Sequence, residues 1–168
     1  MLSCGIIIQL TERKNQIITF FERHPELKLK QEIIDQLITE AKLTREKAYT
    51  PYSHYKVGAA VLCESGKIYG GCNVEDVSYT LTDHAEKVAI LQAILAGEMK
   101  EYGRKFIKAL VVVHEKDSMP CGICRQRIKE FCDEALIINA NQEGKILGIS
   151  CLSELLPAAF GPSHLGKD

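Results

Sequence analysis

A link of only four residues, Asn141 to Gly144, is the feature that most limits how this chain can fold. It joins two runs, 135–140 and 145–151, that are rich in the aliphatic and β-branched residues typical of strands. Parallel neighbours in a sheet need a crossover of about a dozen residues or more. The link is too short for such a crossover, so these two strands are predicted to form an antiparallel hairpin.

The rest of the chain alternates between helix-like and strand-like segments. From Lys30 onward, apolar residues recur at spacings of three and four, which predicts a helix that ends before Pro51. The predicted strands are 56–63, 67–74, 107–113, 135–140 and 145–151, and the other predicted helices are 83–96, 120–131 and 152–159. Helix 83–96 is apolar nearly all round, so we expect it to be buried. This order predicts an α/β fold, a three-layer α/β/α sandwich around a five-stranded mixed sheet.

The N-terminal part of the chain is less readable. Residues 6–10 (IIIQL) are compatible with a short strand, and residues 14–24 with one or two helical turns that Pro25 ends. We therefore divide the chain into an N-terminal extension of unknown role, 1–28, and a single domain, 29–168.

The overall charge gives no reason to expect a polyanionic partner. The chain of 168 residues has 21 basic and 22 acidic side chains, a formal net charge of -1, and no dense run of Lys or Arg. Nucleic-acid binding would need a basic patch, so no nucleic-acid partner is expected. No apolar run approaches the ~20 residues of a membrane span. With no basic, apolar leader at its start, the chain is expected to be cytoplasmic and not membrane-bound.

Seven cysteines are scattered along the sequence. An odd number in a chain of this kind argues against a disulfide framework, and most of them are expected to be small buried hydrophobic residues. Cys121 and Cys124 are different, because their spacing is that of metal ligands or of a redox pair.

Two short motifs carry the chemistry: His84-Ala85-Glu86, and Pro120 to Cys124 (PCGIC). Catalytic zinc needs three protein ligands and one open position, and one imidazole with two thiolates supplies that set. His84, Cys121 and Cys124 each fall near the predicted start of a helix, where the positive end of the helix dipole favours a thiolate. Glu86 lies two residues beyond His84, which suits a general base beside a zinc-activated water.

Each piece also has a structural interpretation. Asp83 and Glu86 have the spacing of a capping box, in which Glu86 would only stabilise the helix start. A lone CxxC is ambiguous between metal, redox and chance, and a single His at a helix start is more often structural. The joint occurrence of the two motifs, each following a strand and opening a helix, favours zinc. The pair also fits the H-x-E…P-C-x-x-C signature of zinc deaminases.

Four stretches of the chain together resemble the cytidine deaminase family over residues 31–166. They are YTPYSHYKVGAAV (49–61), GGCNVEDVSYTLTDHAEKVAI (70–90), PCGICRQRIKEFC (120–132) and LLPAAFGPSHL (155–165). The resemblance implies a five-stranded mixed sheet flanked by helices, with the antiparallel final pair typical of nucleoside deaminases. It implies a Zn²⁺-dependent hydrolase that converts cytidine, 2′-deoxycytidine or both to the corresponding uridine, releasing ammonia in pyrimidine salvage.

The resemblance also assigns substrate-binding residues. In the family, the Asn-x-Glu after the second strand holds a ribose hydroxyl, which here is Asn73 and Glu75. Tyr55 stands at a position, usually Phe, that lines the nucleoside pocket. Phe160 matches a phenylalanine that covers the pyrimidine of a neighbouring subunit, so a homotetramer is favoured. A dimer is the alternative, because family members with His at the position of His84 are typically longer, two-domain dimers.

Two other functions compete with this interpretation. The first is a deaminase of a nucleoside-like antibiotic or modified base, for which the hydroxyl of Tyr55 is the main reason. The second is a non-catalytic zinc module in which His84 and the two cysteines only join two helices. Glu86 and the ribose-binding pair argue against the second, since a structural zinc site closes all four positions with protein ligands.

Overall fold

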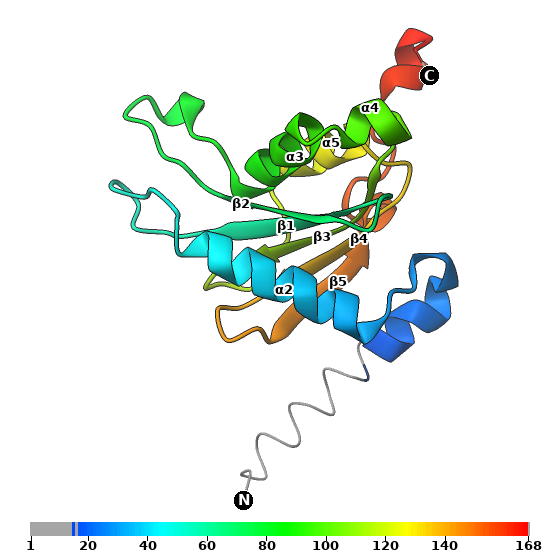
Figure 1. The fold of residues 1–168 in the computed structure, drawn as a ribbon, viewed down its shortest axis with the longest axis horizontal. Coiled ribbons are helices and arrows are strands. Elements are labelled where there is room, and N and C mark those ends of the chain that lie inside the picture. Colours follow the sequence, from blue (N-terminus) through cyan, green and yellow to red (C-terminus); the bar gives the residue numbers. More distant parts are fainter. Residues whose placement is uncertain (1–14, 16, 168) are drawn as a thin grey trace, which may run out of the picture.

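Five strands form one mixed sheet in the order β2-β1-β3-β4-β5 (Figure 1). The structure is a computed structural model that describes residue 15 and residues 17–167. The strands are β1 (Gly58–Cys63), β2 (Ile68–Cys72), β3 (Ile107–Val113), β4 (Leu136–Ala140) and β5 (Ile146–Cys151). Each lies within a segment that the sequence predicted as a strand.

The pairing confirms the predicted hairpin of 135–140 and 145–151 and shows a second one. Strands β4 and β5 are antiparallel, with Leu136 opposite Cys151, and β1 and β2 are antiparallel with Gly58 opposite Cys72. Strand β1 also runs antiparallel to β3, whereas β3 and β4 are parallel. The parallel pair is connected through helix α5 (Gly122–Glu130), as a parallel crossover requires. The mixed sheet is therefore as predicted.

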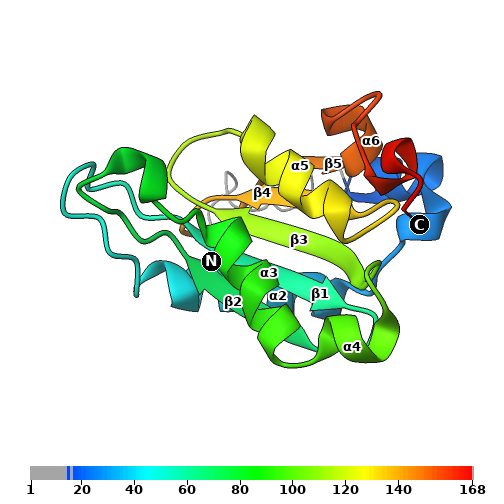
Figure 2. The same cartoon turned by 90° about the horizontal axis from the view of Figure 1, so that it is seen from above.

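Helices cover both faces of the sheet, giving the predicted three layers (Figures 1 and 2). Helix α2 (Gln31–Arg45) packs on one face, and α3 (Ala85–Leu95) and α5 lie on the other. Strand β3 serves both cores: Val111 and Val113 belong to the cluster under α2, and Leu110 and Val112 to the cluster under α3 and α5. This alternation explains why the strand is apolar throughout.

Helix α2 ends at Arg45, before Pro51 as predicted, and Tyr49 pairs with Val74 in an isolated bridge. Other helix ends differ from the prediction. Gly97 adopts a left-handed conformation, φ 97°, and a short helix α4 (Glu98–Tyr102) that the sequence did not predict follows it. At the C-terminus, α6 (Leu152–Leu155) is shorter than the predicted 152–159. Three short 3-10 turns complete the described elements: η1 (Pro25–Leu27), η2 (Tyr79–Leu81) and η3 (Pro162–Leu165).

The expectation that helix 83–96 is buried is only half right. Ala85, Ala89 and Ala93 are fully buried against the sheet, but Leu95 is 83% exposed and Leu91 is 39% exposed. A helix on the outer layer of a sandwich covers the sheet with one face only, whatever the residues on its other face. The apolar outer face of α3 is therefore solvent-accessible in a single chain.

Close contact between α3 and the sheet depends on one glycine. A methyl group at Gly71 of β2 would collide with the backbone of Ala85 and of Ala89. The absence of a side chain at this position lets the first turn of α3 lie directly on β2. The backbone around His84 and Glu86 is thereby fixed against the sheet.

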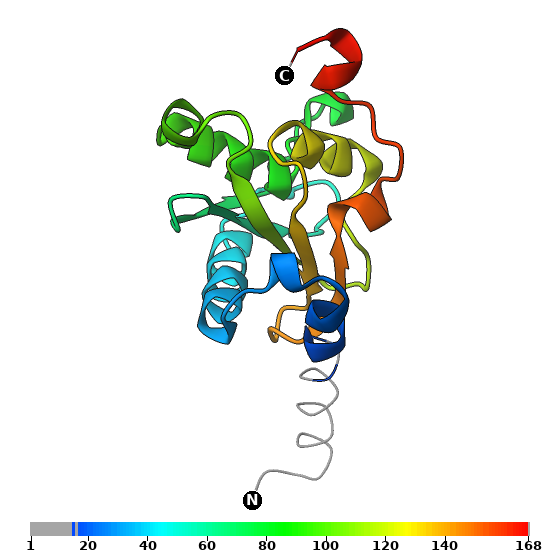
Figure 3. The same cartoon turned by 90° about the vertical axis from the view of Figure 1, so that its right-hand side faces the viewer.

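The part of the N-terminal extension that the structure describes packs onto the domain. Residues 17–23 are helical, consistent with the helical turns expected there, and the strand considered for residues 6–10 lies outside the described residues. Phe20 and Phe21 are buried in the same core cluster as Ile34 and Leu37 of α2. Figure 3 shows this helix (dark blue) in front of the lower part of the sheet, and Figure 1 shows it at the end of the sheet away from the link between β4 and β5. The proposed division at residue 28 thus separates segments that share one core.

Candidate active site

The loop after β2 leads into the first turn of α3, which carries His84 and Glu86. Asp83 pairs with Val74 through two backbone hydrogen bonds of 2.9 Å, so its backbone is extended. His84 consequently becomes the N-cap of α3, and no side chain caps this helix. The Asp83 carboxylate instead accepts a hydrogen bond from Lys87 Nζ at 2.6 Å. The capping box considered for Asp83 and Glu86 is therefore not formed.

The second motif opens helix α5. Cys121 is the N-cap of α5, and Cys124 lies in its first turn. Arg125 holds this loop in place, donating from Nε to the Pro120 carbonyl oxygen at 2.6 Å and from Nη1 to the Leu155 carbonyl oxygen at 2.8 Å. The sequence did not assign this role to Arg125, although it lies within the matching stretch.

The two helix starts bring three potential ligand atoms together. His84 Nδ1 lies 3.4 Å from Cys121 Sγ and 3.3 Å from Cys124 Sγ, and all three atoms are within 4.8 Å of one another. A tetrahedral zinc ion bound to nitrogen at 2.0–2.1 Å and sulfur at 2.3 Å separates such ligand atoms by roughly 3.5 Å. The observed spacing thus fits a zinc ion bound by these three residues.

Glu86 adds a buried carboxylate beside this cluster. Its side chain is on the first turn of α3, and the residue is only 5% exposed. Burial raises the pKa of the Cys124 thiol, and the neighbouring Glu86 and Cys121 raise it further. A divalent cation would reverse this preference, because a coordinating thiol is deprotonated. The charge arrangement therefore favours a cation at the cluster.

A cavity of about 480 Å³ opens beside the cluster. Its lining includes His84, Glu86 and Cys121, together with Asn73, Glu75 and Tyr55. This volume is in the range of small-molecule sites. Six of the eight residues proposed from the sequence therefore line this cavity, and a seventh, Cys124, contacts His84.

Asn73 and Glu75 lie in the cavity wall and hold the loop that precedes β1. Asn73 accepts a hydrogen bond from the Val57 N–H at 2.8 Å and donates to the Tyr55 carbonyl oxygen at 2.9 Å. Glu75 accepts from the backbone N–H of Tyr52 at 2.9 Å and from the hydroxyl of Ser53. The Ser53 hydroxyl lowers the pKa of the Glu75 carboxyl, which is therefore ionised near neutral pH.

Tyr55 is joined to a residue that the sequence analysis missed. Its hydroxyl lies 2.9 Å from Nδ1 of His114, and His114 Nε2 lies 2.9 Å from the Ser118 carbonyl oxygen. His114 is only 4% exposed and lines the cavity. The signal for it was its position directly after β3, because ligands commonly bind at the carboxyl ends of strands in α/β sheets.

Comparison with known proteins agrees with this geometry. The family model of the cytidine and deoxycytidylate deaminase zinc-binding region matches residues 31–140. The chain belongs to this family. It is 42% identical to the cytidine deaminase of Sporosarcina psychrophila over 135 residues. This aligned region covers 79% of this chain and 94% of that protein. It is 36% identical over 140 residues to the probable cytidine deaminase of Dictyostelium discoideum, covering 82% and 90%.

Solved structures of cytidine deaminases have the same fold. The crystal structure of the enzyme from Burkholderia pseudomallei aligns with a TM-score of 0.66 at 39% identity, covering 79% of this chain and all of that one. The enzyme from Mycobacterium tuberculosis aligns with a TM-score of 0.63 at 37% identity, covering 76% and 96%. The family match begins at residue 31, so the N-terminal helix lies outside it.

Phe160 is the one proposed site residue that lies neither in the cavity wall nor in the cluster of potential metal ligands. It is 58% exposed, and its ring stacks on that of His164 with centroids 5.3 Å apart. Gln126 Nε2 donates to its carbonyl oxygen at 2.7 Å. The C-terminal segment that follows projects from the body of the protein (red in Figure 1). Within a single chain, Phe160 is therefore available to another molecule.

Proposed function

We propose that this protein is a zinc-dependent cytidine deaminase that converts cytidine, 2′-deoxycytidine or both to the corresponding uridine, with release of ammonia, in pyrimidine salvage. The observation that carries the proposal is the buried carboxylate of Glu86 beside the His84, Cys121 and Cys124 cluster, at the wall of a cavity large enough for a nucleoside. Membership of the deaminase family and the names of the relatives support the same reaction.

His84, Cys121 and Cys124 are proposed to hold the metal. Zinc bound there would supply a Lewis acid that lowers the pKa of bound water to about 7. The three protein ligands leave a fourth position for water, whereas a structural zinc site would close it. For this reason we favour an enzyme over a non-catalytic zinc module.

Glu86 is proposed to move the protons. The carboxylate takes a proton from the attacking water and delivers it to the ring nitrogen next to the amino-bearing carbon. The water oxygen bonds to that carbon, and Glu86 then takes the remaining proton of this oxygen and passes it to the amine, so that the C–N bond breaks, ammonia leaves and the oxygen becomes the carbonyl of uridine. One carboxylate acts as base and then as acid because the first transfer protonates it. Its freedom from a capping role supports this assignment.

Asn73 and Glu75 are proposed to bind the sugar, in accord with the family resemblance. Both line the cavity, and the ionised Glu75 is a strong acceptor for a hydroxyl. Glu75→Ala should reduce kcat/KM for cytidine by roughly 5- to 150-fold, the effect of losing about 1–3 kcal/mol of hydrogen bonding. Free cytosine, which has no sugar, should be affected much less. Equal losses on both substrates would reject the assignment.

Tyr55 is proposed to line the wall that binds the base or the sugar. Its hydroxyl is the observation that supports the alternative function, deamination of a nucleoside-like antibiotic or modified base. A donor–acceptor pair of Tyr55 and His114 makes this wall more polar than a phenylalanine would. A direct assay follows the loss of ultraviolet absorbance with cytidine, deoxycytidine, cytosine and adenosine. Turnover of the first two supports the proposal, and no turnover of either nucleoside by zinc-loaded protein contradicts it.

We further propose a homotetramer in which Phe160 of one subunit covers the pyrimidine bound by another, with a dimer as the alternative. The exposure of Phe160 and the apolar outer face of α3, including Leu95, support an oligomer. Phe160→Ala should raise KM by roughly tenfold, because the stacking of an aromatic ring on a base contributes about 1–3 kcal/mol to binding. Mixing Phe160→Ala with Glu86→Gln subunits should restore activity, since some sites then have both residues intact. A fully active monomer in light scattering would contradict shared sites.

The reaction is proposed to take place in the cytoplasm. All six cysteines among the described residues are free thiols, and two of them are proposed metal ligands. A reducing compartment keeps such thiols available. Among the described residues, no helix has the length and apolar character needed to span a membrane. No partner beyond the nucleoside and further copies of the chain is proposed.

A further inference from the structure

We propose a second zinc site, formed by His24, Cys151 and Glu154, that fastens the N-terminal helix to the catalytic domain. One ligand atom from each of these residues lies within 4.8 Å of the others. His24 directly follows the helical residues 17–23, Cys151 is the last residue of β5, and Glu154 is in α6. The site therefore joins parts of the chain more than a hundred residues apart.

The donor set suits zinc. An imidazole nitrogen, a thiolate and a carboxylate oxygen are the three side-chain ligands that zinc uses. His24 Nε2 lies 3.3 Å from Glu154 Oε1, close to the spacing of two ligands on one metal ion. Cys151 is 2% exposed, so its sulfur faces the interior of the cluster and not bulk solvent. Water can complete the four positions on the exposed side, where the Glu154 side chain is 39% exposed.

The outer contacts fix the orientation of these ligands. His24 Nδ1 lies 3.5 Å from Glu26 Oε1, the carboxylate–histidine arrangement that directs the other ring nitrogen toward a metal. The ring of Phe20 stacks on the His24 ring, with centroids 4.7 Å apart. Ser150 Oγ donates to Glu154 Oε2 at 2.7 Å, which leaves Oε1 facing His24.

One cation now competes for the same carboxylate. Arg23 Nη1 lies 3.4 Å from Glu154 Oε1, but the Arg23 side chain is 59% exposed. It can turn into solvent at little cost, because exposed ion pairs contribute only about 0–1 kcal/mol. Arg23 thus opposes metal binding weakly, and replacing Arg23 should strengthen zinc binding at this site.

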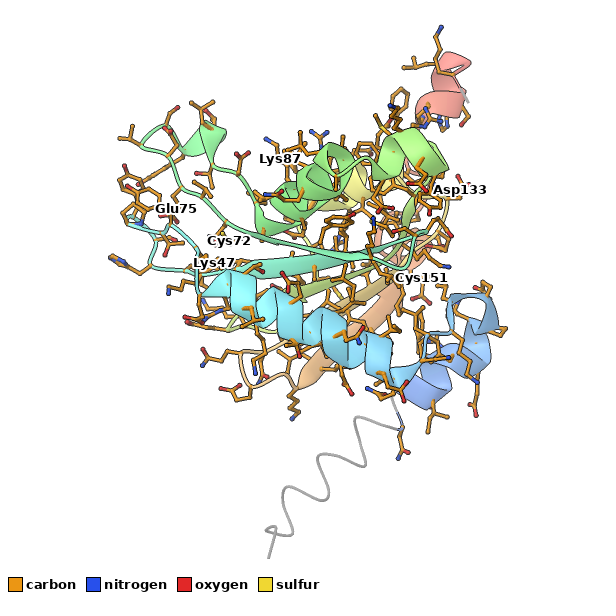
Figure 4. All side chains as sticks on the ribbon, in the orientation of Figure 1. Lys47, Cys72, Glu75, Lys87, Asp133 and Cys151 are labelled. Atoms are coloured by element: carbon orange, nitrogen blue, oxygen red, sulfur yellow. The ribbon has the colours of Figure 1, made fainter. Side chains whose placement is uncertain are left out.

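The site gives the N-terminal helix a function in this chain. Phe20 and Phe21 are already buried in the core, and the proposed ligands lie at the end of this helical segment, at the end of β5 and in α6. Figure 4 places Cys151 at the end of the sheet away from Glu75, which lines the nucleoside cavity. The metal would therefore stabilise the docked helix without entering the proposed reaction.

The test is a zinc titration of the full chain against a competing chelator, with metal content measured after dialysis. The wild type should bind a second equivalent of zinc beyond the one lost in Cys124→Ala. His24→Ala and Cys151→Ser should each lose that second equivalent and keep cytidine turnover. Glu26→Gln should weaken it by about 10–100-fold, as expected for an outer-shell partner. Zinc should also slow amide hydrogen exchange in residues 17–27 of the wild type but not of His24→Ala.

Matched controls separate ligand loss from damage to the fold. Glu22→Gln is a carboxylate change on the same helical segment, and Cys132→Ser replaces another buried free thiol. Both should keep the second equivalent. If Cys151→Ser fails to fold, the zinc content of His24→Ala decides the test, because His24 is only partly buried. A wild type that binds only the equivalent held by Cys124, or a second equivalent that persists in His24→Ala, overturns the proposal.

Discussion

The two clusters of His, Cys and Glu in this protein are assembled in different ways. His84, Cys121 and Cys124 come from two short motifs that each open a helix, so their residue types and local spacing can be recognised in the sequence, although the two motifs meet only in the folded chain. His24, Cys151 and Glu154 come from segments with no such motif, and they meet only because the N-terminal helix packs on the sheet. A contiguous motif can be read directly from a sequence, whereas a cluster made by docking depends on the whole core.

The clusters also differ in what lies beside them. The first adjoins a cavity and the buried carboxylate of Glu86, an arrangement suited to reaction. The second has outer contacts on every ligand, including Glu26 beside His24 and Ser150 beside Glu154, an arrangement suited to holding segments together. The difference predicts that changes in the first cluster affect turnover, and that changes in the second affect stability.

The sharpest test of this difference is Cys124→Ala. It should abolish turnover, because the proposed metal at the first cluster loses one of its three protein ligands. Metal analysis should find one equivalent of zinc fewer, with the second cluster still loaded. Cys72→Ser, a thiol change outside both clusters, is the control and should keep metal and activity. Retained activity in Cys124→Ala would contradict the assignment of the first cluster to catalysis.

Glu86→Gln separates catalysis from structure within the first cluster. Turnover should fall by about 10²–10⁴-fold, the usual effect of losing a general acid–base group, while zinc binding and thermal stability stay close to wild type. The reason is that Glu86 neither caps α3 nor belongs to the three metal ligands. Steady-state kinetics and thermal unfolding of the same preparation measure both quantities. A stable variant with wild-type turnover would return Glu86 to a structural role.

Phe20→Ala tests whether docking of the N-terminal helix creates the second cluster. Phe20 is 1% exposed, so the variant should lose about 3–5 kcal/mol of unfolding free energy, measured by urea denaturation. Its zinc affinity at the second cluster should fall as well, because the ring stacks on His24. Ile18→Ala, on the same helix but 54% exposed, should change stability by less than about 0.5 kcal/mol. A Phe20→Ala variant as stable as Ile18→Ala would show that docking contributes nothing.

The smallest expected effect is a pH dependence at the second cluster. The Ser150 hydroxyl lowers the pKa of Glu154 in the folded protein, with His24 contributing. A lowered folded pKa gives stability that is present above the unfolded value and is lost as pH falls through the folded value. Metal-free wild type should therefore lose more stability than Glu154→Gln below the ordinary pKa of 4.5. Because Glu154 is partly exposed, the difference should stay below about 1 kcal/mol in urea denaturation. If the unfolding free energies of the two proteins changed in parallel with pH, the prediction would be wrong.

Most of the fold was predictable because its signals are local. The four-residue link at 141–144 specified an antiparallel pair, and the apolar run of 107–113 indicated the strand that the structure buries on both faces. Helix ends were less predictable, since they depend on partners elsewhere in the chain. Asp83 was expected to begin a helix, but its pairing with Val74 moved the start of α3 to Ala85.

The sequence by itself identified the candidate residues of the first cluster, because His84, Cys121 and Cys124 occupy two recognisable motifs, whereas tertiary packing brought the two motifs together. It also indicated Asn73 and Glu75 through the family resemblance. Only the tertiary structure decided that His114 pairs with Tyr55 and that His24 meets Cys151 and Glu154. Such contacts join residues distant in the chain, and no local spacing specifies them. They exist because burial of residues such as Phe20 and Val111 brings their segments onto the same sheet.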